Sequence, residues 1–136
     1  MSIFNDALQR IKTFRENRLQ GKFNSIPFGI LDDYIPGIMR GVYYLISANT
    51  GVGKTQLTKY LFVLNAIKFI EKNPKSNIKL KIFYFALEES KDEFIASLIS
   101  ARLREKYDLK IPTTKLLSLG HSILDESVIK LVEEER

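Results

Sequence analysis

Residues 47–56, with the sequence SANTGVGKTQ, combine residue types that bind the phosphates of a nucleoside triphosphate. Gly51 and Gly53 allow the backbone to curl so that successive N–H groups converge on a phosphate, at the positive end of a following helix. Lys54 would then reach the β- and γ-phosphates, and the hydroxyl of Thr55 would complete the coordination of Mg²⁺. We therefore predict ATP and Mg²⁺ as cofactors, with Thr55 as a metal ligand and with nucleotide contacts from Asn49, Thr50, Gly51, Val52, Gly53, Lys54, Thr55 and Gln56.

The segments on either side of this loop have the patterns that the chemistry requires. Residues 42–47, VYYLIS, form an apolar run without polar alternation, which predicts a strand buried on both faces. From Lys54, apolar residues recur at helical spacing and stop before Pro74, which predicts a helix. Residues 48–55 match the P-loop pattern except that Ala48 replaces its first glycine, and the closest backbone approach to the phosphate falls on the later glycines.

Hydrolysis also requires a group that orients the attacking water. Residues 80–87, LKIFYFAL, predict a second buried strand, and Glu88 follows at its carboxyl end, where doubly wound α/β folds bind ligands. Glu88 is therefore the predicted catalytic residue, together with Lys54. Glu89 is the alternative, but adjacent strand residues face opposite ways, so only one of the two acids would point at the phosphate. If neither is catalytic, both acids simply favour the N-terminus of the next helix.

A second acid that would hold the metal is harder to identify. Asp125 and Glu126 follow the apolar pair Ile123 and Leu124, but two apolar residues are too few for a buried strand. Asp125 is better placed to cap the last helix. His121 is expected to be a loop residue rather than a ligand, and the absence of cysteine excludes thiolate metal sites.

Composition and charge bound the class of protein. With 136 residues, 45% of them hydrophobic and 27% charged, the chain is expected to fold as one globular domain. No apolar run approaches the roughly 18 residues of a membrane span, so we expect a cytoplasmic protein with no membrane partner. Residues 1–80 hold 12 Lys or Arg against 5 acids, and residues 81–136 hold 9 against 11. This excess supports an anionic partner only weakly, because charge runs are usually solvated loops.

The remaining segments predict mostly helices. Residues 1–21 have the spacing of an amphipathic helix, and a connector broken by Pro and Gly follows at residues 22–41. Ser90 and Glu93 form the pattern of a capping box that opens a helix. A last helix is expected after Asp125; its final turn is acidic, where the helix dipole prefers cations, and no Gly or Pro stops it.

Three stretches together resemble one family. SIPFGILDDYIPGIMRG, VYYLISANTGVGKT and IFYFALEES resemble the start of the motor domain of DnaB-type replicative helicases, in the RecA-like branch of P-loop ATPases. The shared features are an Ile-Pro-x-Gly opening, a Leu-Asp pair, the P-loop and a strand ending in a Ser-Leu-Glu-like triplet, here Ala86-Leu87-Glu88. The resemblance covers about residues 25–105 and implies an α/β, RecA-like P-loop NTPase fold. This chain would hold an incomplete version, with two buried parallel-type strands and flanking helices.

The resemblance also implies a function and partners. Proteins of this family form hexameric rings that move along single-stranded DNA and couple ATP hydrolysis to strand separation, and Glu88 lies at the position of their catalytic glutamate. We therefore predict the ATP-binding part of a DNA-dependent ATPase or replicative helicase. Residues 1–21 would be its linker-like helix, and residues 22–136 the front of the ATPase domain, truncated before the second metal-binding strand. The parts that contact DNA would lie beyond residue 136, and the partners would be DNA and further copies of the chain.

Other classes of function stay open. A RecA-like recombinase or signalling ATPase would share the same loop and strand pattern. An interaction module that binds ATP without hydrolysing it, or that mimics a helicase subunit, would need no catalytic acid. A GTPase is less favoured because the chain has no Asn-Lys-x-Asp motif, and a small-molecule kinase because no lid or substrate pocket is recognisable.

Overall fold

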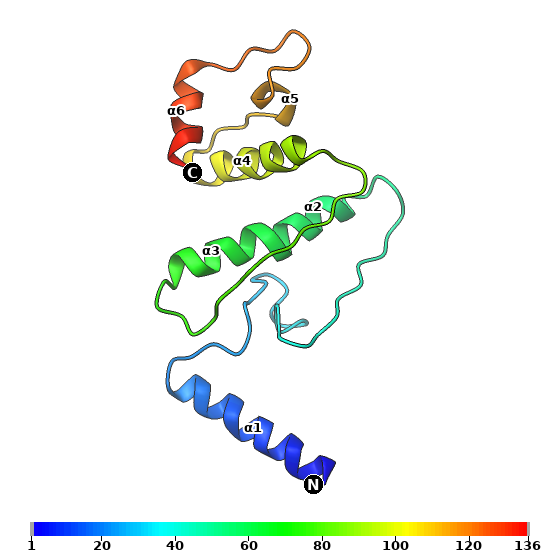
Figure 1. Cartoon of the computed structure of the whole chain (residues 1–136), viewed down its shortest axis with the longest axis vertical. Helices are drawn as coiled ribbons and strands as arrows, with labels where there is room; N and C mark the ends of the chain where they lie inside the picture. Colours follow the sequence, from blue (N-terminus) through cyan, green and yellow to red (C-terminus); the bar gives the residue numbers. More distant parts are fainter. Residues whose placement is uncertain (1, 136) are drawn as a thin grey trace. The chain divides into compact units, whose positions relative to one another are not determined.

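The computed structural model describes residues 2–135 and divides the chain into two compact units, residues 1–82 and 83–136 (Figure 1). Each unit has its own hydrophobic core. Within the described residues, no helix is long and apolar enough to cross a lipid bilayer. The helical elements are α1 (Ile3–Leu19), α2 (Lys54–Thr58), the π-helix η1 (Lys59–Leu64) and α3 (Asn65–Lys72) in the first unit, and α4 (Lys91–Tyr107), α5 (Thr113–Leu116) and α6 (Glu126–Glu134) in the second.

The expectation of an α/β, RecA-like fold with two buried strands is wrong. The structure is 49% helical with only 1% in strands, and residues 2–135 contain no sheet. The β contact in this part of the chain is an isolated antiparallel bridge between Ile26 and Ile38. Both segments predicted as strands, residues 42–47 and 80–87, are coil (Figure 1).

The physical reason lies in what a buried strand needs from the rest of a protein. Its backbone N–H and C=O groups require hydrogen-bonding neighbours, and its side chains require cover on both faces. Here Tyr43 is 85% exposed, Phe85 87% and Leu87 98%. The apolar pattern is that of a buried strand, but the pairing and the cover are long-range properties that a local pattern does not contain.

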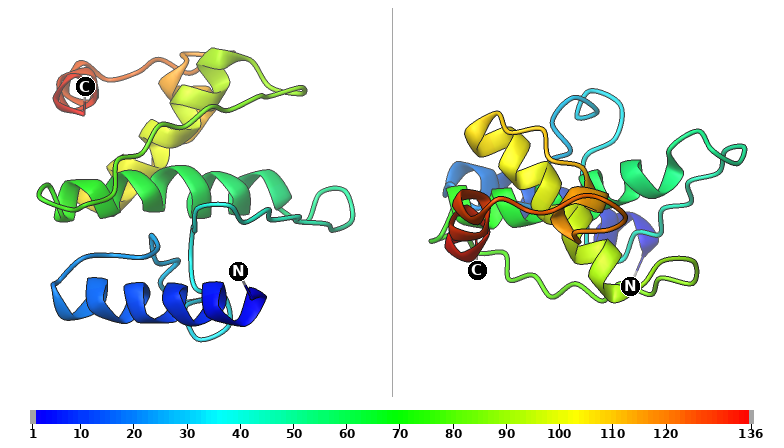
Figure 2. Two further views of the ribbon diagram at one scale, coloured as in Figure 1. Left: turned by 60° about the horizontal axis from the view of Figure 1, so that its bottom comes forward. Right: turned by 90° about the horizontal axis from the view of Figure 1, so that it is seen from above.

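The predicted helix after the P-loop is present as a continuous rod. The elements α2, η1 and α3 follow one another directly from Lys54 to Lys72 (Figure 2, left, green). The rod ends before Pro74, and the side-chain amide of Asn73 donates a 2.9 Å hydrogen bond to the carbonyl of Phe69 at this end. One side of the rod is packed into the unit, since its buried apolar residues are Leu61, Val63, Leu64, Ala66 and Phe69.

The connector between α1 and the P-loop packs on this rod. Ile26 is 2% exposed and forms a core cluster with Ala66 and Phe69. Ile26 and Ile38 exchange two backbone hydrogen bonds, of 3.0 and 2.8 Å, which close the connector into a loop. The hydrophobic effect and this short ladder therefore fix the connector without a sheet.

An aromatic cluster fixes the segment that leads into the P-loop. The ring of Phe28, 2% exposed, meets the rings of Tyr44 and Phe62 edge-on, at centroid distances of 5.8 and 5.3 Å. The hydroxyl of Tyr44 also donates a hydrogen bond to the carbonyl of Gly37. Tyr44 thus attaches residues 42–47 to the rod and to the connector.

The predicted N-terminal helix is present as α1, but its apolar stripe is not covered. None of residues 3–19 is buried, and Phe4 and Ile11 are 71% and 65% exposed. The amide of Asn24 donates a 2.8 Å hydrogen bond to the carbonyl of Phe14, and the amide of Asn17 donates a 2.9 Å bond to Asn24. These bonds attach the C-terminal half of α1 to the connector.

The second unit is built on α4, which begins with the predicted capping box. The hydroxyl of Ser90 accepts a 3.2 Å hydrogen bond from the N–H of Glu93, and the carboxylate of Glu93 accepts a 2.8 Å bond from the N–H of Ser90. Leu103, Ile111 and Val128 form the core of this unit, drawn from α4, the loop after it and α6.

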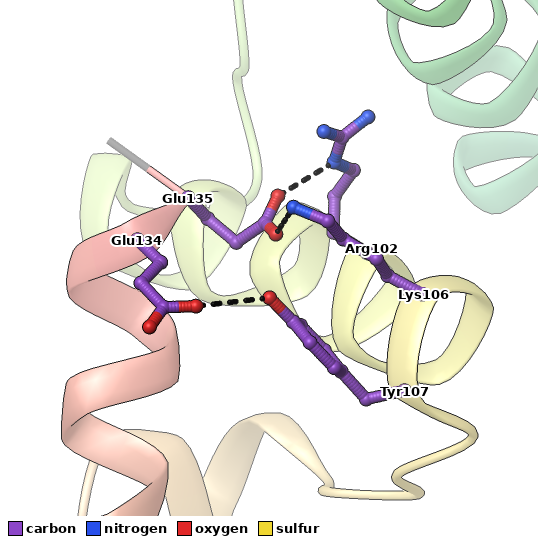
Figure 3. A network of polar contacts seen from close by, with 5 residues as sticks. All are labelled: Arg102, Lys106, Tyr107, Glu134 and Glu135. Carbon is purple, nitrogen blue, oxygen red and sulfur yellow. Dashed lines mark hydrogen bonds and ion pairs between the residues drawn. The ribbon is translucent and has the colours of Figure 1, made fainter.

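Cations of α4 compensate the acidic end of α6. The carboxylate of Glu135 accepts hydrogen bonds from Arg102 Nε at 3.0 Å and from Lys106 Nζ at 2.7 Å, and Tyr107 donates to Glu134 at 3.3 Å (Figure 3). The hydrogen bond from Lys106, followed by that from Arg102, holds the pKa of Glu135 below its ordinary value, against the opposing effect of burial. These contacts offset the unfavourable interaction of acids with the C-terminal end of a helix dipole.

Gly37 occupies a position that only glycine fits. Its φ is +85°, and a Cβ there would lie 2.0 Å from the carbonyl oxygen of Ile26. We expect Gly37→Ala to lower the free energy of unfolding by more than the roughly 1–3 kcal/mol that a strained backbone conformation alone costs. Urea unfolding would measure this loss. Gly29→Ala is the matched control, because Gly29 has φ +74° but a Cβ there would meet no atom within 4 Å. Equal losses in both variants would contradict the clash.

Glu135 should make stability depend on pH in the acid range. Its pKa is lower in the folded chain than the ordinary value of 4.5, so its stabilising contribution is present above pH 4.5 and is lost as pH falls through the folded pKa. We expect Glu135→Gln to reduce the melting temperature at neutral pH and to flatten its decline in acid. The control is Glu133→Gln, an exposed position on the same helix. Parallel melting-temperature profiles for wild type and Glu135→Gln would contradict the assignment.

Candidate phosphate-binding loop

The loop at residues 47–53 contains two glycines with left-handed backbone conformations. Gly51 and Gly53 have φ values of +81° and +91°, in the left-handed region that glycine adopts without strain. A Cβ at either glycine would meet no atom within 4 Å. Glycine is therefore required here by backbone conformation rather than by crowding.

The side chain of Lys54 folds back across this loop. Its amino group donates hydrogen bonds to the carbonyl oxygens of Ala48, at 2.6 Å, and Asn49, at 3.0 Å. Lys54 is half-buried, whereas Thr55, Gln56 and residues 49–53 are exposed. The loop is thus closed by its own lysine, and the ammonium charge lies at the mouth where phosphate oxygens would bind.

The N-terminus of the rod supplies further donors beside this charge. The N–H of Leu57 donates a 2.9 Å hydrogen bond to the carbonyl of Gly53, which is the last residue of the loop. Lys54, Thr55 and Gln56 come before Leu57 in the first turn of the rod. The N–H groups of a first turn have no partner within their own helix. Together with the helix dipole they favour an anion at this position.

The donor set fits a magnesium–nucleotide complex. Mg²⁺ prefers oxygen ligands and commonly keeps phosphate oxygens and water in its coordination sphere. The exposed hydroxyl of Thr55, directly after the lysine, is the oxygen that this loop offers to such a metal. Mg²⁺ would supply positive charge that stabilises the phosphate oxygens, while the chain itself would contribute the N–H groups, the Lys54 ammonium and the Thr55 hydroxyl.

The two candidate catalytic acids lie in the second unit, at the loop before α4. The carboxylate of Glu89 accepts a 3.2 Å hydrogen bond from the hydroxyl of Tyr84, whose ring stacks on Phe94 at 4.2 Å. Burial, with the nearby Glu89 carboxylate as a second cause, raises the pKa of Tyr84. Glu88 is exposed. Glu89 is therefore engaged in local packing, and Glu88 is the acid that presents its carboxylate to solvent.

The weaker metal candidates are involved in other interactions or are exposed. Asp125 begins α6 as expected, but its side chain makes no capping hydrogen bond. Its carboxylate instead accepts a 2.9 Å hydrogen bond from the ammonium group of Lys115. Glu126 and His121 are exposed.

Sequence reasoning missed a basic cleft on the first unit. It has a volume of about 700 Å³, and Arg10, Arg40 and Lys79 line it together with the rings of Phe14 and Phe23. None of the described residues that line the cleft is acidic. The available signal was the excess of 12 basic residues over 5 acids in residues 1–80, but these cations come from α1, the connector and the segment after α3, so no short motif links them.

The residues that could bind an anion lie together at the start of a helical rod. In comparisons with known proteins, no family model, no curated protein and no solved structure matches this chain. The interpretation of the site therefore depends on its own residues and contacts.

Replacing Lys54 tests the phosphate-binding loop directly. We expect Lys54→Ala to weaken Mg·ATP binding roughly tenfold or more, because a hydrogen bond to a charged group contributes about 1.5–3 kcal/mol. Isothermal titration calorimetry would measure the affinity, and circular dichroism would confirm an unchanged helix content. Lys72→Ala removes a cation from the far end of the same rod and is the matched control. Unchanged ATP affinity in Lys54→Ala would contradict the assignment of the loop.

Proposed function

We propose that this chain binds ATP with Mg²⁺ through residues 48–56. The observation that carries this proposal is the placement of the Lys54 amino group across a loop with two left-handed glycines, directly before a helix. Lys54 and the first-turn N–H groups are adjacent donors that would bind a triphosphate, and the Thr55 hydroxyl beside them is the oxygen that would coordinate Mg²⁺. Phosphate oxygens would replace the carbonyl partners that Lys54 has now.

We further propose that the chain is part of a DNA-dependent ATPase of the DnaB type, acting in the cytoplasm as an oligomeric ring. The resemblance of residues 25–105 supports this finer proposal. The basic cleft at Arg10, Arg40 and Lys79 supports an anionic polymer as partner, because cations next to aromatic rings suit single-stranded nucleic acid. DNA contacts outside this chain would add to that cleft.

In this proposal, Glu88 would orient the water that attacks the γ-phosphorus. The bond from the γ-phosphorus to the bridging oxygen breaks as the bond to water forms, and ADP carries away the electron pair. Lys54 would stabilise the charge that develops on the phosphate oxygens. The exposure of Glu88 is consistent with this role, whereas Glu89 already has Tyr84 as a partner.

A second candidate is an interaction module that binds ATP without hydrolysing it. One observation favours it: residues 2–135 contain no sheet, and a sheet is what aligns a catalytic acid with the P-loop in doubly wound α/β proteins. Nucleotide would then stabilise the first unit and adjust its affinity for a partner.

Hydrolysis with and without single-stranded DNA separates the two candidates. For the ATPase, we expect turnover that DNA stimulates and that Glu88→Gln slows by about 10²–10⁴-fold, because removing a positioned base or water-orienting group has effects of this size. Binding of ATP should be retained. Glu89→Gln is the matched control and should keep near-normal turnover. Tight ATP binding with no turnover in the wild type would favour the module, and DNA-independent turnover would contradict the helicase proposal.

A further inference from the structure

A second basic cavity adjoins the basic cleft of the first unit. It has a volume of about 470 Å³, and Lys22 and Lys75 line it from the end of α1 and from the loop after α3. These two segments lie on the same side of the unit (Figure 2, left). Phe23 and Asn77 line both the second cavity and the cleft, so the two are direct neighbours.

Hydrogen bonds between distant residues hold the walls of the second cavity together. The side chain of Asn77 accepts a 2.8 Å bond from the N–H of Phe23 and donates a 2.9 Å bond to the carbonyl of Phe23. The ring of Phe23 also meets the buried Phe69 edge-on, at a centroid distance of 4.8 Å. These contacts fix Lys22 beside the loop that carries Lys75, and neither lysine side chain takes part in them.

Exposed cations line both cavities without nearby acids. Lys22 and Lys75 lie in the second cavity, and Arg40 and Lys79 lie in the cleft. None of the described residues that line the second cavity is acidic, and these four cations form no ion pair within residues 2–135. Cations gathered in this way repel one another, and a bound polyanion relieves the repulsion and releases its own counterions.

We propose that one strand of nucleic acid binds along both cavities, with its phosphates at Lys22 and Lys75 in one and at Arg40 and Lys79 in the other. The inference rests on the DNA partner of the proposed function, and it assigns contacts with that partner to this chain. A basic groove that follows the backbone is how proteins bind single strands without sequence preference. A single strand can bend into two neighbouring cavities, whereas a duplex is stiff over roughly 150 base pairs.

Removing the cations in pairs tests the proposed path of the strand. We expect Lys22→Ala with Lys75→Ala to weaken binding of a fluorescent oligothymidylate roughly tenfold or more near 0.1 M salt, because counterion release at two phosphates is lost. Fluorescence anisotropy across a salt series would measure the affinity. The slope of log affinity against log salt should become shallower by about 1.4, since each contact to a single strand contributes about 0.7. Arg40→Ala with Lys79→Ala should have an effect of the same size.

A matched control removes the same charge elsewhere on the first unit. Lys12→Ala with Arg15→Ala changes exposed positions of α1 that line neither cavity, and this variant should bind nearly as tightly as the wild type. Circular dichroism would verify that all three variants keep their helix content. An equal loss in the control, an unchanged salt slope in the two paired variants, or equal affinity for a duplex would each overturn the proposal.

Turnover measurements separate a failure of this inference from a failure of the proposed function. Oligonucleotide binding that both paired variants lose, but that never stimulates ATP hydrolysis in the wild type, would support the two-cavity site and contradict the DNA-dependent ATPase. DNA-stimulated hydrolysis that both paired variants retain in full would overturn the two-cavity site and leave the ATPase proposal standing.

Discussion

Extended backbone can be buried only where it finds hydrogen-bonding neighbours, and this requirement governs the organisation of the chain. Two apolar segments, residues 42–47 and 80–87, carry strand-like sequences, yet no sheet forms within residues 2–135. Helices satisfy most of their backbone groups internally, so a helical segment can be buried without a neighbouring strand. The result is two helical units with separate cores, one around Ala66 and Phe69 and the other around Leu103. Most side chains of residues 42–47 and 80–87 are exposed, although Tyr44 and Tyr84 each pack within their own unit.

The candidate phosphate-binding loop depends much less on distant contacts. Its features are two left-handed glycines, a lysine bonded to carbonyls five and six residues before it, and a rod that starts at the same lysine. All of them lie within a short stretch of sequence, so the loop forms without a sheet behind it. The position of a catalytic acid is not fixed by neighbouring residues in this way. Its position relative to a bound nucleotide is set by the elements that connect the two, which makes binding a more local property than hydrolysis.

The same distinction explains which features could be predicted from the sequence. The helix at residues 3–19, the rod from Lys54 and the capping box of Ser90 and Glu93 were predictable, because spacing and caps act over a few residues. The buried strands were not, because apolar composition does not identify a pairing partner. Asp125 shows the limit of sequence-based prediction for a single residue. It precedes a helix as expected, but its carboxylate binds Lys115 and does not cap the helix. The cleft between α1 and the connector required tertiary structure to be seen.

The π-helix at Lys59–Leu64 has a consequence for the two ends of the rod. An α-helix advances about 100° per residue, whereas π-type hydrogen bonds span five residues and widen the turn. The angular phase of the rod therefore changes between the loop end and the core end. Leu57, one turn before the buried Leu61, is 45% exposed. Lys54 and the buried Phe69 therefore do not point in the relative directions that one uninterrupted α-helix would give them. The π-helix rotates the loop end of the rod relative to its core end. When the core end is packed, the length of the π-helix therefore sets the direction in which Lys54 faces.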